Sequence, residues 1–225
     1  MSKGAGEMAD NNNIAFIYYT NHENECAESL KCLDLLNLPS GYTITKKILQ
    51  GNFNIAQSYN FAMRNSTAKY KIYLHKKMNI VNRNFLIEIL SLFKNHPELG
   101  MLGVLGAKKM PPSGNWRDST ERCGKIIFLG KPLVYSDEIT HEYEPVRSID
   151  GMIMITQYDL PWRADLFENQ YYYDSAQCME FIKAGYTIGI PMQREPWCSY
   201  NSSDDIILFF QEREIFLRNY QEFIT

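Results

Sequence analysis

The segment Tyr70-Lys-Ile-Tyr-Leu-His-Lys-Lys-Met78 indicates the fold more clearly than any other part of the sequence. Aromatic and aliphatic residues dominate its first half, and such residues favour a buried strand. His75, Lys76 and Lys77 then follow in succession, so the strand should end in a polar exit. Because alternate side chains of an extended strand share a face, His75 and Lys77 should point in the same direction.

On both sides of this strand, the sequence alternates between strand-like and helix-like patterns. Further strands are predicted at 14–20, 42–49 and 100–105, and helices at 24–36, 54–65 and 82–95. This order is typical of α/β proteins, in which helices cover both faces of a mostly parallel central sheet and so form three layers. Ligands of such sheets bind at the carboxyl ends of the strands. The candidate strand ends are Thr20-Asn21, Leu49-Gln50 and His75-Lys76-Lys77.

The second half of the sequence is less regular. A turn-rich loop is predicted at 111–122, short strands at 125–129, 134–135 and 186–190, and a longer strand at 148–156. A helix at 173–184 should end at Gly185, because glycine commonly follows the last turn of a helix. A long helix is predicted at 204–223. Its apolar residues would let it dock on the domain or on a second copy of the chain, which leaves a homodimer open; they are Ile206, Ile207, Phe210, Phe216, Leu217 and Tyr220.

The composition describes one globular domain, with 225 residues of which 45% are hydrophobic and 22% charged. Residues 1–13 are polar and are predicted to form a disordered head, so the domain is expected at 14–225. The head lacks the apolar core of a signal peptide, and no apolar run approaches the ~18 residues of a membrane span, which predicts a cytoplasmic protein without a transmembrane segment. A net charge of -3 argues against nucleic-acid binding. The five cysteines form no C-x-x-C pair, so free thiols are expected.

Several short motifs stand in the order of one known family. Neither G-x-G-x-x-G nor G-x-x-x-x-G-K-[ST] occurs, so dinucleotide and P-loop sites lose their main support. From residue 14 to about 202, however, the sequence resembles a glycosyltransferase-like family-2 domain, which has the GT-A fold. The matching motifs are Tyr73-Leu-His75, Gly100-Met-Leu-Gly-Val-Leu-Gly106, Pro112-Ser-Gly-Asn-Trp116, Ile149-Asp-Gly151, Thr156-Gln-Tyr-Asp159, Pro161-Trp162, Tyr173-Asp174, Glu180-Phe181, Ala184-Gly-Tyr186 and Pro196-Trp-Cys198.

The resemblance implies a nucleotide-diphosphate sugar as donor, an acidic base at a helix start and a divalent cation at the end of the third strand. The base matches Asp174, which could also serve as a helix N-cap that stays ionised. In relatives the strand ends Leu-His-Gln-Asp-Val, and its metal-binding Asp matches Lys77, while a His expected after Cys198 matches Tyr200 approximately. Both departures concern the metal, so no cofactor is predicted and Mn²⁺ or Mg²⁺ is disfavoured. Lys77, with Lys76, would instead face phosphate as a point charge; the alternative is two solvated lysines.

The resemblance also implies further contacts to the nucleotide sugar. Those at strand ends are Thr20, Asn21, Gln50, His75 and Lys76, and those on the second helix are Ala56, Tyr59 and Asn60. Asp150-Gly151 would contact the donor sugar or the acceptor, or would simply form a turn. Trp162 and Trp197 could stack on sugar rings, but a place in the core is the better prediction for each.

The function that these residues predict is the inverting transfer of a sugar from a nucleotide-diphosphate sugar, preferably a UDP-sugar, to an unidentified sugar or glycan acceptor. Asp174 would take the proton of the acceptor hydroxyl, and Lys77 would stabilise the leaving diphosphate. One alternative is a domain of the same fold that binds a nucleotide or sugar without transfer, because decay would also remove both metal positions. A nucleotidyltransferase is weaker, since it too would require acidic metal ligands.

Overall fold

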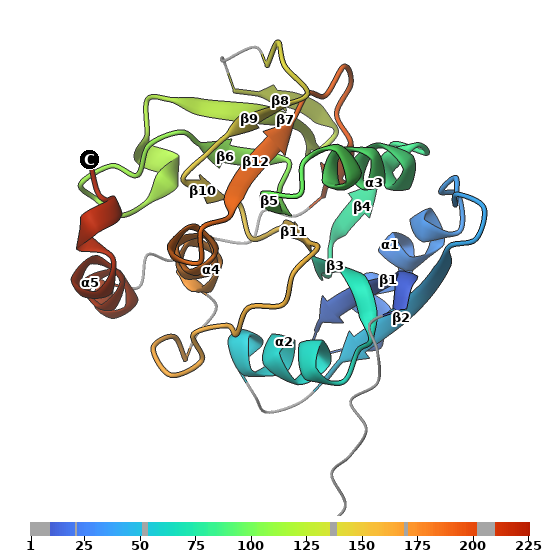
Figure 1. Ribbon diagram of the computed structural model, residues 1–225, viewed down its shortest axis with the longest axis horizontal. Helices are drawn as coiled ribbons and strands as arrows, with labels where there is room; N and C mark the ends of the chain where they lie inside the picture. Colours follow the sequence, from blue (N-terminus) through green and yellow to red (C-terminus); the bar gives the residue numbers. More distant parts are fainter. Residues whose placement is uncertain (1–9, 21, 51–53, 136–138, 169–170, 202–209) are drawn as a thin grey trace, which may run out of the picture.

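The chain folds around a mixed central sheet, shown in the computed structural model of Figure 1, which describes residues 10–20, 22–50, 54–135, 139–168, 171–201 and 210–225. Within these residues the sheet has seven strands, in the order β2 (Thr43–Leu49), β1 (Asp10–Tyr19), β3 (Ala68–His75), β11 (Ile153–Thr156), β5 (Leu99–Leu102), β12 (Thr187–Pro191) and β9 (Tyr143–Pro145). β1 is parallel to β2 and β3, and β5 to β12, whereas β11 and β9 run against their neighbours. The predicted α/β class with a mostly parallel sheet is confirmed.

Helices cover both faces of this sheet. On one face lie α1 (Ala27–Leu33), which follows the short helix η1 (Glu23–Cys26), and α3 (Phe85–Asn95), whose Phe93 stacks on Tyr70 of β3. On the other face lie α2 (Ile55–Arg64) and α4 (Tyr173–Lys183). Tyr73 of β3 contacts Tyr59 of α2 there, because residues three apart in a strand point to opposite faces. The result is the three-layer arrangement that the sequence predicts.

Local sequence signals set the ends of two of these helices. The side chain of Asn54 accepts a hydrogen bond of 2.8 Å from the Gln57 N–H, so it caps the first turn of α2. Gly185 follows α4 with a φ of +88°, a conformation that glycine adopts without strain. The predicted end of the 173–184 helix is therefore confirmed.

A second sheet of short strands lies beside the first (Figure 1). Its order is β10 (Ser148–Ile149), β6 (Leu105–Ala107), β7 (Arg122–Phe128), β13 (Cys198–Tyr200) and β4 (Met78–Ile80), with β8 (Lys131–Val134) paired to β7, and the short helix η2 (Trp116–Asp118) precedes β7. Two predicted strands are wrong in extent: 100–105 is divided into β5 and β6, and 148–156 into β10 and β11. In both places the chain crosses from one sheet to the other, so neither segment stays extended throughout.

The predicted disordered head is too long, because β1 begins at Asp10. Asn13 pairs with Thr43 of β2, and Asp10 lies opposite Ala68 of β3. Polar residues can extend this strand because its first residues are exposed while their backbone groups pair with a neighbouring strand. Residues 1–9 of the predicted head lie outside the described residues.

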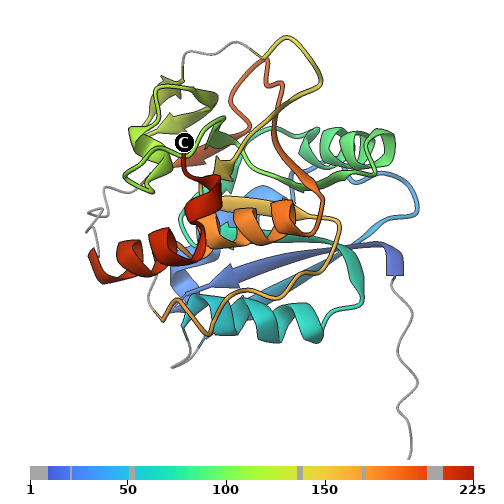
Figure 2. The same ribbon diagram turned by 60° about the vertical axis from the view of Figure 1, so that its left-hand side comes forward.

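The C-terminal helix α5 (Phe210–Asn219) and the short helix η3 (Gln221–Phe223) pack on α4, as Figures 1 and 2 both show. The Tyr220 hydroxyl donates to Glu180 at 2.7 Å, and the buried Phe216 ring lies 5.2 Å from that of Tyr172. The apolar face of α5 thus docks on its own domain. Residues 204–209 of the predicted helix, including Ile206 and Ile207, lie outside the described residues. No described helix is both long and apolar enough to cross a membrane.

Candidate functional site

Lys76 and Lys77 form the turn between β3 and β4. The prediction that Lys77 continues an extended strand is therefore wrong, because the chain turns there to enter the second sheet, so strand alternation does not place its side chain on the face of His75. The backbone N–H of Lys77 lies 3.3 Å from His75 Nδ1, which is a contact of a tight turn. The polar exit itself is confirmed, and it stands at the carboxyl end of β3.

Two predicted residues meet at the carboxyl ends of β1 and β3. Lys76 Nζ forms an ion pair of 2.7 Å with Glu25 Oε1, and the Thr20 hydroxyl donates to Glu25 Oε2 at 2.6 Å. The Lys76 ammonium, followed by the Thr20 hydroxyl, lowers the pKa of Glu25 to about 2. Sequence reasoning missed Glu25, which no motif marks. Gln50 is exposed just beyond β2, and Asn21 lies outside the described residues.

Tyr200 lies next to this turn. In the second sheet it pairs with Met78, the residue that follows Lys77, and its ring centroid is 5.3 Å from that of His75. The two positions at which the family resemblance implies metal ligands are therefore neighbours. Among the described side chains at this turn, the Glu25 carboxylate is already paired with Lys76, so it is not an open metal ligand. No group of three or more His, Cys, Asp or Glu in the described parts of the chain could hold a metal ion.

Asp174 is the second residue of α4 and does not cap that helix. The N-cap position belongs to Tyr172, whose φ is 58°, and its side chain makes no capping hydrogen bond. Asp174 instead accepts two backbone hydrogen bonds: Gly151 donates to Oδ2 at 3.0 Å and Ser175 to Oδ1 at 2.7 Å. Its carboxylate is therefore fixed by the turn between β10 and β11 as well as by its own helix.

Asp150 sits in the turn between β10 and β11, but it faces the protein interior. Its side chain is 4% exposed and forms an ion pair of 2.6 Å with Arg117 Nη2 of η2. Its second oxygen accepts the N–H of Met152 at 2.8 Å. At Gly151 there is no room for a side chain, because a Cβ atom would lie 2.6 Å from the Tyr173 hydroxyl and 2.9 Å from Asp174 Oδ2. Of the two predicted roles of Asp150-Gly151, the turn is confirmed, and Asp150 is held inside the protein.

The surroundings of Asp174 raise the pKa of its carboxyl to about 6. Burial is the largest cause and the charge of Asp150 the second, whereas Arg117 and the two backbone N–H groups oppose the rise. The sequence-based expectation considered only the helix start, which favours the ionised form, and so missed the direction of this shift. A carboxyl with a pKa near 6 is mostly ionised at neutral pH and still able to take up a proton.

A short chain of hydrogen bonds connects the lysine turn to Asp174. The N–H of His75 donates to the carbonyl of Met152 at 2.9 Å, and the neighbouring Gly151 donates to Asp174. His75 contacts the backbone of Lys77 in turn. These contacts link the end of β3 to the turn that binds Asp174, at the place where the two sheets meet. Sequence reasoning missed Arg117, although it follows the Pro112–Trp116 motif directly.

The remaining predicted residues lie in the core. Trp162 is 2% exposed and Trp197 3%, so the core prediction is confirmed and neither ring is open for stacking on a sugar. Asn60 holds the Trp162 backbone through two hydrogen bonds of 2.8 and 2.9 Å. Ala56 and Tyr59 of α2 are buried as well, and the Tyr59 ring contacts that of Trp162. These three residues of α2 therefore serve the packing of the core, where Tyr59 and Asn60 hold Trp162 and its backbone in place.

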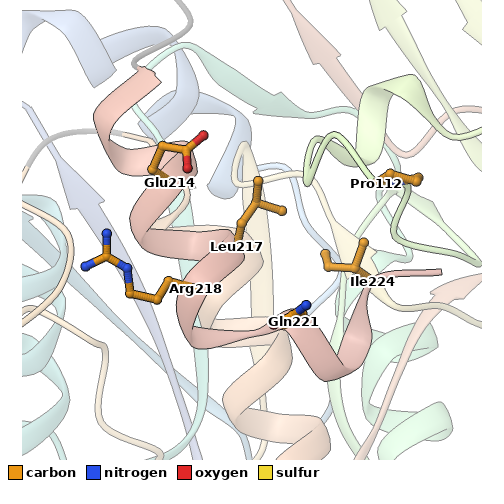
Figure 3. Close-up of a pocket in the computed structure, with 6 residues that line it drawn as sticks. All are labelled: Pro112, Glu214, Leu217, Arg218, Gln221 and Ile224. Atoms are coloured by element: carbon orange, nitrogen blue, oxygen red, sulfur yellow. The ribbon is translucent and has the colours of Figure 1, made fainter.

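A separate groove of about 370 Å³ lies between α5, η3 and the loop after β6 (Figure 3). None of the residues of the site described above lines it; those that do are Pro112, Glu214, Leu217, Arg218, Gln221 and Ile224.

The sequence pattern of the glycosyltransferase-like family matches residues 15–220. The chain belongs to the glycosyltransferase-like family. The resemblance carried by the short motifs is thereby confirmed for nearly the whole chain. A comparison with curated proteins gives no match.

Solved structures share the fold of this glycosyltransferase-like chain. Residues 1–349 of S. aureus TarS, in complex with UDP-GlcNAc, give a TM-score of 0.58 at 10% identity, covering 86% of this chain and 59% of that one. The mannosyltransferase PcManGT from Pyrobaculum calidifontis, with GDP-Man and Mn²⁺, gives 0.53 at 10% identity over 89% and 61%. A variant of Drosophila beta-1,4-galactosyltransferase 7, with manganese, UDP-Gal and xylobiose, gives 0.54 at 12% identity over 90% and 79%. At these identities the likeness shows the fold, and the chain spans about three fifths of the first two proteins.

Proposed function

We propose that this chain transfers a sugar, with inversion, from a nucleotide-diphosphate sugar to an acceptor hydroxyl. Family membership supports the reaction class. The observation that carries the proposal is the Asp174 carboxylate, which two backbone N–H groups hold in one orientation and whose pKa is about 6. A fixed carboxylate with a near-neutral pKa is what a general base for a sugar hydroxyl requires.

In this reaction the acceptor hydroxyl gives its proton to Asp174 while its oxygen bonds to the anomeric carbon. The bond between that carbon and the diphosphate oxygen breaks, and its electron pair leaves with the diphosphate. Attack from the side opposite the leaving group inverts the anomeric centre. The negative charge that grows on the diphosphate needs a fixed cation, and an ammonium at the carboxyl end of β3 could supply it.

Lys77 stands at the position where the family resemblance places the metal-binding Asp, which is the ground for proposing it as the contact to the diphosphate. The Lys76 ammonium is already paired with Glu25 at 2.7 Å, so a diphosphate would have to compete with that carboxylate. We propose that Lys77 stabilises the leaving group and that no divalent cation is needed. The described side chains around the turn support this proposal: they are a histidine, a tyrosine, two lysines and Glu25, and the Glu25 carboxylate is already paired with Lys76, whereas Mn²⁺ and Mg²⁺ prefer several oxygen ligands.

A UDP-sugar is the proposed donor. TarS and the galactosyltransferase bind UDP-sugars in their structures, whereas the mannosyltransferase binds GDP-Man. Because these proteins share little sequence with this chain, the nucleobase of the donor must be tested directly. The acceptor is proposed to be a sugar or glycan hydroxyl.

The test is a calorimetric panel of UDP, GDP and TDP sugars, with chelator and then with Mn²⁺, followed by a transfer assay against a mixture of glycan acceptors. We expect UDP-sugars to bind in chelator and to release UDP only when acceptor is present. An affinity gain above about tenfold with Mn²⁺, roughly 1.4 kcal/mol, would overturn metal independence. Binding without any transfer would favour the alternative of a non-catalytic domain, which the Lys76–Glu25 pair also favours because it neutralises one predicted phosphate contact.

A further inference from the structure

The Asp174 carboxylate is bound by a turn, and a residue outside that turn, Arg117, holds the turn in place. The Gly151 N–H that binds Asp174 Oδ2 belongs to the turn at Asp150–Met152. That turn is tied at its first residue by the Arg117–Asp150 ion pair and at its last by the Met152 N–H, which donates to the same Asp150 side chain. The Tyr173 hydroxyl closes the arrangement by donating to the Gly151 carbonyl at 3.2 Å.

We propose that Arg117 is a positioning residue for the Asp174 carboxylate, acting through the Asp150 ion pair and the turn that follows it. This inference rests on the proposed role of Asp174 as general base. Arg117 does not need to touch a substrate in this role. It fixes Asp150, Asp150 fixes the turn, and the turn presents one N–H group to the base.

The position of Arg117 is well determined by its own contacts. Its guanidinium carbon lies 4.7 Å from the centre of the Trp116 ring, which is 2% exposed. Its carbonyl accepts a hydrogen bond of 2.9 Å from Arg122, and its N–H is bound by the Asn115 side chain at 3.2 Å. The two hydrogen bonds fix the backbone of Arg117, and the Trp116 ring restricts its guanidinium. A restricted guanidinium can hold a carboxylate in one geometry at a smaller entropic cost than a mobile one.

The same geometry makes the two charges act in opposite directions on Asp174. The negative charge of Asp150 disfavours the ionised form of Asp174, and the positive charge of Arg117 favours it. Three other titratable groups that interact with Asp174 lie on its own helix or just before it and stay neutral at physiological pH, namely Tyr172, Tyr173 and Cys178. Removing the charge of either partner should therefore move the titration of Asp174 in a defined direction.

The experiment is a pH titration of the ¹³C signal of the Asp174 carboxyl in the full chain, read beside the pH profile of kcat/KM. Arg117→Met should raise the Asp174 pKa, and Asp150→Asn should lower it. In Arg117→Met, kcat should also fall about tenfold or more, because a misplaced base is costly, while donor affinity should stay within about twofold. Arg117→Lys keeps the charge, so it should move the pKa less than Arg117→Met.

Arg163→Met is the matched control. Arg163 is also paired with a carboxylate, Asp165 at 2.7 Å, and its side-chain exposure of 29% is close to the 32% of Arg117. This variant should leave the Asp174 titration unchanged.

If Arg117→Met and Asp150→Asn move the titration no more than this control, or both move it in one direction, the proposal is overturned. If the titration shifts as expected but no donor is ever turned over, the proposed function fails and the positioning role stands. If Arg117→Met does not fold, Asp150→Asn decides: an unchanged Asp174 titration together with unchanged kcat overturns the proposal.

Discussion

Asp174 differs from an ordinary surface aspartate in its neighbours. Burial and the Asp150 charge raise its pKa to about 6, and backbone N–H groups from two segments bind its oxygens. A base of this kind is matched to proton transfer near neutral pH. The proposed role as general base requires this charge, yet the fold gains little from it, so activity and stability should separate when Asp174 is changed.

Asp174→Asn tests that separation. Asparagine keeps the size of the side chain and one oxygen for the backbone N–H groups, but it cannot take a proton. We expect turnover to fall by about two to four orders of magnitude while donor affinity is kept. Turnover and melting temperature should be measured on the same preparation. Unchanged turnover would show that Asp174 is not the base.

Lys77→Ala tests the proposed contact to the diphosphate. We expect UDP affinity to fall by about tenfold, since one charged hydrogen bond is worth roughly 1.5–3 kcal/mol, while uridine affinity stays constant. Lys76→Ala is the comparison: it also removes one positive charge from the turn, so it separates a general charge effect from loss of the proposed Lys77 contact. Calorimetry of both ligands with both variants gives the answer. Equal UDP affinity in wild type and Lys77→Ala would make Lys77 a solvated surface residue.

Sequence reasoning could find residues that stand in short motifs, and it missed those whose role comes from distant contacts. The Tyr173-Asp174 motif marked the proposed base. Nothing local marks Arg117 as its partner, because the pair with Asp150 forms only when η2 meets the turn after β10. For the same reason the direction of the Asp174 pKa shift was missed: burial and the charge of Asp150 are properties of the fold.

Among the elements, the turn at Asp150–Met152 connects the largest number of site residues. It joins β10 of the second sheet to β11 of the first, and its backbone contacts β3, α4 and its own side chain at Asp150. Such a turn tolerates little change in shape. Its sequence predicted one long strand instead, because apolar residues on both sides hide the point at which the chain changes sheets.

Gly151→Ala should disturb this turn without adding charge. The new methyl group would meet the Tyr173 hydroxyl and Asp174 Oδ2, and such overpacking typically costs about 1–3 kcal/mol. We expect lower stability to chemical denaturation and lower kcat together. Gly130→Ala is the control: it meets no atom within 4 Å, so its positive φ affects stability alone. Full activity in Gly151→Ala would argue against a fixed turn.

The packing of α5 on the domain gives a second prediction about a single structural element. Phe216 is fully buried against Tyr172 and Tyr220, so Phe216→Ala should lower the free energy of unfolding by about 3–5 kcal/mol. Phe61 lies on α2 with 63% of its surface exposed, and Phe61→Ala should change stability by less than about 0.5 kcal/mol. Urea unfolding of both variants measures the difference. Similar values would mean that α5 adds nothing to the domain.

In the molecule as a whole, most of the central sheet was predictable, although β9 was missed. In the second sheet the predicted strands at 125–129 and 134–135 overlap β7 and β8, but β4 and β13 were missed. The strands that alternate with helices up to β5 are long and apolar enough to leave a clear pattern. The second sheet is built from strands of two to seven residues, and it pairs β13 with β4 across more than half of the chain. No periodic pattern survives in a strand of three residues. Half of the candidate site lies at this junction, so its geometry was equally hidden.

The pH dependence of the whole protein should show two opposite effects. Transfer should fall as the pH drops below about 6, because Asp174 takes up a proton. Stability should respond differently: the raised pKa of Asp174 makes its charge unfavourable above 6, and this cost is relieved as the pH falls toward 3.8. Glu25, whose pKa is lowered to about 2, contributes stability above 4.5 that is lost in stronger acid.

Unfolding of wild type and Asp174→Asn at pH 8 and pH 5 checks the sign. The variant should gain stability relative to wild type at pH 8, and the gain should shrink at pH 5, where wild type is largely protonated. A gain that grows toward pH 5 would contradict the raised pKa of Asp174.

The contact between Arg213 and Ser113 gives the C-terminal helix a second role. Arg213 Nε of α5 donates to the Ser113 carbonyl at 2.6 Å, in the loop that leads to Arg117. A substitution near the end of the chain could therefore reach the base through this loop without altering a residue of the site. During evolution, variation in α5 would give relatives of this protein a way to adapt to more acidic or more alkaline surroundings while the residues of the proposed site stay as they are.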